Sequence, residues 1–157
     1  MSVLAPVLAI LCALGAATVA GVFFTFSTFT MTGLKRLSAA HGMVAMQAIN
    51  AAAPSPVFML LLFGTGAACL ALGAHAGLNL DQPGAALRVI AAALYIAGVV
   101  LLTLGYHVPR NRILAGLDPD SSEGAAYWAR YQREWVRMNH VRTVAPLFSA
   151  LLLILSL

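Results

Sequence analysis

Charged residues are scarce in this sequence. Only 9% of the 157 residues are Asp, Glu, Lys or Arg, whereas 61% are hydrophobic, and the mean hydropathy is +0.89. Because soluble domains are about a quarter charged, this composition excludes an ordinary soluble globular protein. It favours a protein that lies within a membrane.

Basic residues are missing from the first 34 positions. A secretory signal peptide begins with a basic segment and continues with an apolar stretch of about 7–15 residues. The first apolar run here is much longer than that. We therefore expect it to remain in the mature protein as a membrane-spanning helix.

Four apolar runs are long enough to cross a bilayer, which takes about 20 helical residues. They cover about 3–34, 56–76, 85–106 and 141–157. The connections leave no room for a separate soluble domain. We predict an all-α, polytopic membrane protein: a single transmembrane four-helix bundle over 1–157, with an amphipathic extension before the fourth helix.

The basic residues are unevenly distributed. Eight of the nine lie in or directly beside the connecting segments 35–55 and 107–140, and the exception is Arg88 in the third run. Positive charge beside membrane spans marks the cytoplasmic side. We expect a multi-pass protein of the cell membrane with these two segments in the cytoplasm, both termini outside, and no nucleic-acid partner despite the net charge of +4.

Prolines mark two expected helix boundaries. Pro54 and Pro56 follow the helical stretch "AAHGMVAMQAINAA" and should separate it from the second span. Pro109 should end the third helix, since the residue before a proline disfavours helical geometry.

The segment "DPDSSEG" predicts the start of a helix, with Asp120 or Ser121 as its N-cap. The helix from about residue 122 should run directly into the fourth span. Its charges are spaced for surface ion pairs of Glu134 with Arg130 and with Arg137.

Polar side chains gather at the predicted cytoplasmic ends of the spans. They are Gln47, Asn50, His107, Asn111, Asn139, His140 and Arg142. Tyr131, Trp135, Asn139 and Arg142 share one helical stripe. Ionisable groups at membrane depth usually face the bundle interior and are functional-site candidates, so Arg142 is favoured as a functional residue over a merely topological one. His140 points about 100° away from Asn139 and joins them only if two sides of that helix are enclosed.

Several motifs resemble the anthrone oxygenase-like family of small membrane proteins. They are "GVFFTFSTFTMTGLKRL", "AMQAIN" followed by prolines and "FM", "VPRN" with "LAGLDPDS", and "W..MNHVRT". The resemblance implies oxidation of an aromatic anthrone to an anthraquinone with molecular oxygen, the activity of the characterised fungal branch. By motif the matching positions are Asn50, Pro109, Asn111, Trp135, Asn139, His140, Arg142 and Thr143. His107 departs from the small polar residue expected before "VP".

Such a reaction requires removal of a proton and stabilisation of the resulting anion. The sequence favours His140 as the base, and Arg142 with Asn139, Asn111 or Asn50 as the groups that hold the oxyanion. The candidate substrate-binding residues are Gln47, Phe26, Phe29, His107, Tyr131 and Trp135. Cofactor-free chemistry is favoured, with a hydrophobic aromatic molecule and membrane lipid as partners.

Metal chemistry remains an alternative. His41, His107 and His140 lie on separate segments and offer imidazoles that suit copper or iron, but no HxxxH, HxxE or CxxC spacing occurs. No metal ligand is therefore assigned. Cys12 and Cys69 fit no redox motif and are expected to be buried free thiols.

A non-enzymatic protein is the competing hypothesis. A four-helix membrane protein with a polar recess can bind a lipid or quinone, or serve as an accessory subunit. Its asparagines would then cap helices and join them by hydrogen bonds. The small-residue faces of the first two spans suit packing within one chain or between two copies in a homo-oligomer.

Overall fold

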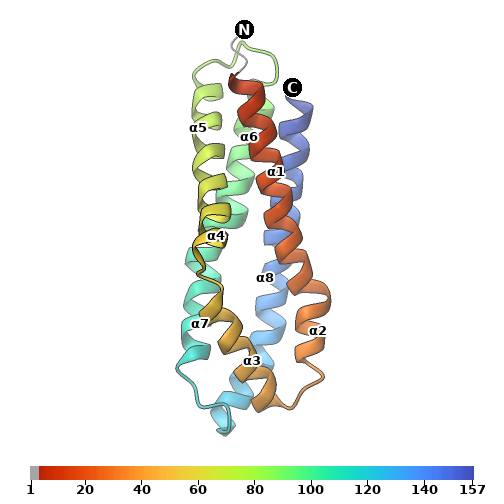
Figure 1. The fold of residues 1–157 in the computed structure, drawn as a ribbon, viewed down its shortest axis with the longest axis vertical. Helices are drawn as coiled ribbons and strands as arrows, with labels where there is room; N and C mark the ends of the chain where they lie inside the picture. Colours follow the sequence, from red (N-terminus) through yellow and green to blue (C-terminus); the bar gives the residue numbers. More distant parts are fainter. Residues whose placement is uncertain (1–3) are drawn as a thin grey trace.

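The computed structural model describes residues 4–157, and this part of the chain is helical without strands. The chain forms four long helices. They lie side by side and run alternately up and down, so that the two ends of the chain lie at the same end of the bundle (Figure 1). The α-helical segments are α1 (Leu4–Thr25), α2 (Met31–Leu34), α3 (Ala39–Ala52), α4 (Pro56–Met59), α5 (Thr65–Gly77), α6 (Ala85–Tyr95), α7 (Val108–Ala115) and α8 (Ser122–Leu155). The π-helical turns are η1 (Phe26–Thr30), η2 (Leu60–Gly64), η3 (Ile96–Leu101) and η4 (Thr103–His107).

Joined through these turns, the segments make four helices with the length and apolar composition of membrane spans. These helices are Leu4–Leu34, Pro56–Gly77, Ala85–Ala115 and Ser122–Leu155. The prediction of an all-α four-helix membrane protein is confirmed, and only the predicted start at residue 3 lies outside the described residues. A 31-residue helix is about 47 Å long at 1.5 Å per residue, whereas the hydrocarbon core is about 30 Å thick. The longer helices therefore extend beyond the membrane.

The third helix is longer than predicted. Pro109 lies in the first turn of α7, directly after the π-helical turn η4, and the helix continues to Ala115. A π-helical turn changes the backbone hydrogen-bond register. A proline in the first turn after it removes no helical hydrogen bond, because the N–H groups of a first turn have no acceptor within the helix. The prediction that Pro109 ends the helix is therefore wrong.

The break predicted before the second span and the helix start predicted near residue 122 are confirmed. α3 ends at Ala52 and α4 begins at Pro56. Ser121 caps α8, its Oγ accepting a hydrogen bond of 2.9 Å from the Gly124 N–H. The expected pairs of Glu134 with its own helix do not form, because its carboxylate lies 3.6 Å from Nε of Arg110 on α7.

Two apolar clusters fill the bundle. The first joins α1, α5, α6 and the last third of α8, and uses small residues where backbones approach: Gly73 faces Ala92, and Gly98 faces Ala145. The second lies at the opposite end, where α2, α3 and α7 surround the first half of α8. It contains Met31, Leu34, Met43, Met46, Leu114, Trp128, Tyr131 and Trp135.

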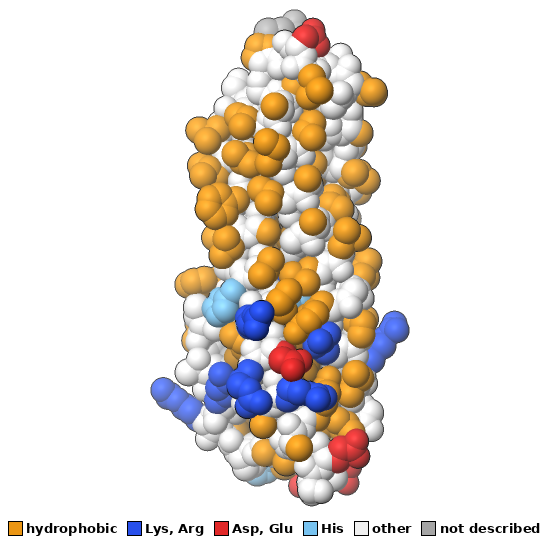
Figure 2. All heavy atoms as spheres, turned by 180° about the vertical axis from the view of Figure 1, so that it is seen from behind, with side chains coloured by type: hydrophobic (Ala, Val, Ile, Leu, Met, Phe, Trp, Pro, Cys, Tyr) orange, Lys and Arg blue, Asp and Glu red, His pale blue; other side chains and the backbone are white. Residues whose placement is uncertain are grey.

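The face of the molecule seen in Figure 2 divides into two zones. Orange apolar side chains cover the long upper part of the molecule, while the Lys and Arg side chains gather around the lower part (Figure 2). The lower zone carries the second apolar cluster inside it.

Candidate functional site

A cavity of about 340 Å³ lies between the two apolar clusters. α1, α3, α4, α7 and α8 contribute to its wall. Its lining residues are Val22, Phe23, Phe26, Met46, Ile49, Asn50, Ala52, Ala53, Ser55, Phe58, Asn111, Trp135 and Arg142. The wall is therefore aromatic and aliphatic, with two amides and a guanidinium as its main polar groups.

Arg142 is the one cation in this wall, and its side chain is buried, with 5% of the residue exposed. Its guanidinium lies 4.1 Å from the ring centroid of Phe23 and 5.1 Å from that of Trp135. Both faces of aromatic rings attract cations. The two rings thus hold the guanidinium at the edge of the cavity.

Asn139 fixes the Arg142 head group from the same helix. Its Oδ1 accepts hydrogen bonds from Nε at 3.1 Å and from Nη2 at 2.6 Å. Its Nδ2 donates to the Phe23 carbonyl at 2.7 Å and to Ser27 Oγ at 2.7 Å. Thr103 Oγ1 accepts the remaining contact from Nη1 at 3.4 Å. The guanidinium therefore has neutral partners on three sides.

Within residues 4–157, no carboxylate forms an ion pair with Arg142. Glu134 pairs with Arg110 instead, and the other acidic residues lie in the loops and the first turn of α8. A buried charge is normally paired. The site is consequently short of one negative charge.

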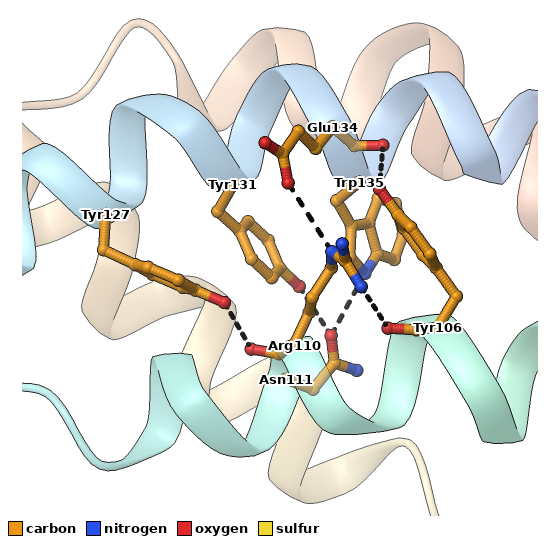
Figure 3. A network of polar contacts seen from close by, with 7 residues as sticks. All are labelled: Tyr106, Arg110, Asn111, Tyr127, Tyr131, Glu134 and Trp135. Atoms are coloured by element: carbon orange, nitrogen blue, oxygen red, sulfur yellow. Dashed lines mark hydrogen bonds and ion pairs between the residues drawn. The ribbon is translucent and has the colours of Figure 1, made fainter.

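Asn111 on α7 organises the aromatic side chains that line one face of α8. Its Oδ1 accepts hydrogen bonds from Tyr131 Oη at 2.8 Å and from Trp135 Nε1 at 3.1 Å, as Figure 3 shows. In the same network Arg110 lies 3.5 Å from the Tyr106 ring centroid, and Tyr106 Oη donates to the Glu134 carbonyl. These contacts hold α7 against α8 and keep Trp135 in the cavity wall.

α3 closes the cavity on another side. Asn50 Nδ2 donates to Tyr131 Oη at 3.5 Å. Gln47 lies one turn earlier and donates to the carbonyls of Leu114 and Leu117 at 2.9 and 3.1 Å. Gln47 therefore ties α3 to the end of α7, whereas Asn50 faces the cavity.

A second cavity, of about 490 Å³, lies on the other side of Asn50 and Phe58. It shares Asn50, Asn111 and Arg142 with the first and also reaches His107. The remaining lining residues are Gln47, Ala51, Ala53, Pro54, Phe58, Met59, Leu62, Phe63, Thr103, Leu104, Val108, Arg112 and Ala115. The guanidinium of Arg142 is thus reached from both cavities.

Two predicted site residues lie elsewhere. His140 is exposed and borders a shallow apolar hollow formed with Leu94, Val144 and Phe148. Asn139 points inward, so the next residue on the helix is rotated by about 100° and points out. Phe29 is 65% exposed and also faces away from the cavity. The structure therefore places His140 and Phe29 apart from the other predicted site residues.

The three histidines considered as metal ligands are not brought together. His41 and His140 are exposed on different helices, and His107 is buried between α7 and α8. Across the described residues, no three His, Cys, Asp or Glu side chains form a cluster that fits a metal ion.

Several residues of the site carry no sequence signal for their role. Ser27 and Thr103 complete the Asn139–Arg142 arrangement, although one lies on η1 and the other on η4. Phe58 borders both cavities and stands edge-on to Phe23, with 6.3 Å between the ring centroids. In the sequence, only its place in the "FM" that follows "AMQAIN" and the prolines set it apart.

Comparison with known proteins supports one relationship. The model of a family described as anthrone oxygenase matches residues 43–152, well over half of the chain. This range begins within α3 and ends within α8, and it includes every residue that lines the first cavity except those of α1 and η1. Searches of curated proteins and of solved structures found no match. On the family match, the chain belongs to the anthrone oxygenase family.

Proposed function

We propose that this protein is an integral membrane oxygenase that oxidises a hydrophobic aromatic substrate, an anthrone or a related hydroquinone, with molecular oxygen. The observation that carries the proposal is the buried guanidinium of Arg142, which has no carboxylate partner among residues 4–157 and borders an aromatic-walled cavity. Family membership supports the same class of reaction.

The size and lining of the site suit such a substrate. Ligand cavities typically hold about 300–1,000 Å³ and combine apolar walls with a few placed polar groups. The two cavities, of about 340 and 490 Å³, fall in this range. Phe23, Phe58 and Trp135 offer faces and edges to a planar ring system.

The chemistry follows from the charge of the site. Loss of a proton from the central methylene of an anthrone leaves an electron pair that is shared with the carbonyl oxygen, which becomes negative. Arg142 is fixed by Asn139 before the substrate arrives, so it stabilises this oxyanion without reorganisation. The anion then reacts with oxygen, and one anthrone plus one O2 gives one anthraquinone plus one water. Substrate, oxygen and side chains suffice for this sequence.

The test is oxygen uptake by the purified protein in nanodiscs with a panel of anthrones and hydroquinones. Arg142→Met should lower kcat/KM by about 100- to 1,000-fold, the usual effect of removing one oxyanion donor. Arg137→Met removes an exposed arginine of the same helix and should leave the rate unchanged. Full activity in Arg142→Met would overturn the proposal, and ligand binding without any uptake in the wild type would favour a lipid or quinone carrier.

A further inference from the structure

His107 is buried without a hydrogen-bond partner. The residue is 0% exposed, and neither Nδ1 nor Nε2 forms a hydrogen bond within the described part of the chain. The backbone of Met138 lies beside the ring but does not reach hydrogen-bond geometry. Buried polar atoms are nearly always satisfied, so an exception requires an explanation. A buried polar group without a partner destabilises the folded state.

Aromatic contacts hold the imidazole in place. Trp135 stands edge-on to it, with 5.1 Å between ring centroids and 84° between planes. Tyr106 does the same from the neighbouring position, at 5.3 Å and 68°. These rings fix the orientation of the imidazole but offer it no hydrogen-bond acceptor. The ring is therefore held in one orientation while both of its nitrogens lack a hydrogen-bond partner among the described residues.

The imidazole belongs to a residue that lines the second cavity, and neighbouring atoms cover both of its nitrogens in this structure. Arg142, Asn111 and Asn50 line the same cavity and the first one as well. A ligand whose oxygen reaches Arg142 thus occupies a space that His107 also borders. The exposed His140 has no such access.

From this geometry we propose that His107 is the general base of the reaction, an inference that rests on the proposed function. A C–H bond of the substrate methylene breaks, and its proton passes to the unprotonated ring nitrogen of His107. The electron pair remains on the substrate and is shared with the oxygen that Arg142 holds. The substrate is the partner that the unsatisfied imidazole lacks.

The experiment separates proton removal from oxidation. The protein in nanodiscs is incubated with anthrone in D2O under strictly anaerobic conditions, and deuterium in the methylene group is measured by mass spectrometry. The wild type should accelerate exchange above the uncatalysed rate, and His107→Gln should lower this acceleration by about 100-fold or more. His140→Gln is the matched control and should exchange as the wild type does.

A second variant keeps the test valid if His107→Gln does not fold. His107→Gly leaves a space for free imidazole, and added imidazole should restore exchange in this variant but have no effect on His107→Gln. A thermal unfolding curve of each variant is recorded in parallel. Restored exchange supports the assignment even if His107→Gln is unstable.

Two results would overturn the inference. One is unchanged exchange in folded His107→Gln, and the other is wild-type oxygen uptake in air with no anaerobic exchange. The proposed function fails by a different result, namely absence of uptake in the wild type with every substrate of the panel.

Discussion

The amide of Asn139 bonds to Arg142 through its oxygen and to the Phe23 carbonyl and Ser27 through its nitrogen. It thereby positions the guanidinium without neutralising it. At the scale of a residue, a guanidinium held by an amide can still bind an anion, whereas a guanidinium in an internal ion pair cannot. A carboxylate at position 139 would neutralise the guanidinium of Arg142 and leave no free positive charge for a negatively charged ligand.

Asn139→Asp should therefore lower kcat/KM for an anthrone by about 10- to 100-fold, the range expected when a charge-assisted hydrogen bond of about 1.5–3 kcal/mol to the substrate is lost. Steady-state oxygen uptake measures it. Asn79→Asp, which adds the same charge in the loop at the other end of the molecule, is the control and should have no effect. Unchanged kinetics in Asn139→Asp would contradict an anion site at Arg142.

At the scale of the element, close packing between the third and fourth helices depends on Gly98. A methyl group at this position would collide with the side chain of Ala145, whereas one at Gly105 on the same helix would meet nothing within 4 Å. Small residues allow helices to approach closely in a membrane. The two glycines thus offer a matched pair.

Gly98→Ala should lower the free energy of unfolding by about 1–3 kcal/mol, the usual cost of overpacking. Thermal unfolding in detergent measures this loss, and Gly105→Ala should be neutral or slightly stabilising, since alanine favours helix over glycine. Adding Ala145→Gly to Gly98→Ala should restore most of the stability. A double variant as unstable as the single one would show that the collision is not the cause.

At the scale of the whole molecule, the two zones of the surface in Figure 2 bear on its orientation. The basic zone surrounds the ends of α3 and α7 and the first half of α8, and the opposite end holds the loop between α5 and α6. We propose that the basic zone faces the cytoplasm, as positive residues beside spans usually do. Both termini would then face outward.

Cysteine labelling tests this orientation. Asp81→Cys and Asp120→Cys place exposed thiols at opposite ends, while the native Cys12 and Cys69 are buried. A membrane-impermeant maleimide should label Asp81→Cys in intact cells and Asp120→Cys only after lysis. The reverse pattern would invert the orientation.

Composition and run length were enough to predict the four spans, because a helix in lipid must satisfy its own backbone and cover itself with apolar side chains. The cap at Ser121 and the break between α3 and α4 were predictable for a similar reason, since both depend on neighbouring residues. The continuation of the third helix past Pro109 was not predictable. It depends on the π-helical turn η4, which directly precedes the segment that contains the proline. That turn has no signature in the local sequence.

The candidate site likewise combines features that the sequence determined with features that only the tertiary structure decided. Helical spacing placed Tyr131, Trp135, Asn139 and Arg142 on one stripe, and the structure buries all four together. Spacing along α8 is a local property, so the sequence determined it. Which histidine borders the cavity was decided only by tertiary structure, because His107 and His140 lie on different helices and their facing depends on how these helices pack. The missing counter-charge of Arg142 likewise emerged only once every carboxylate had a place in space.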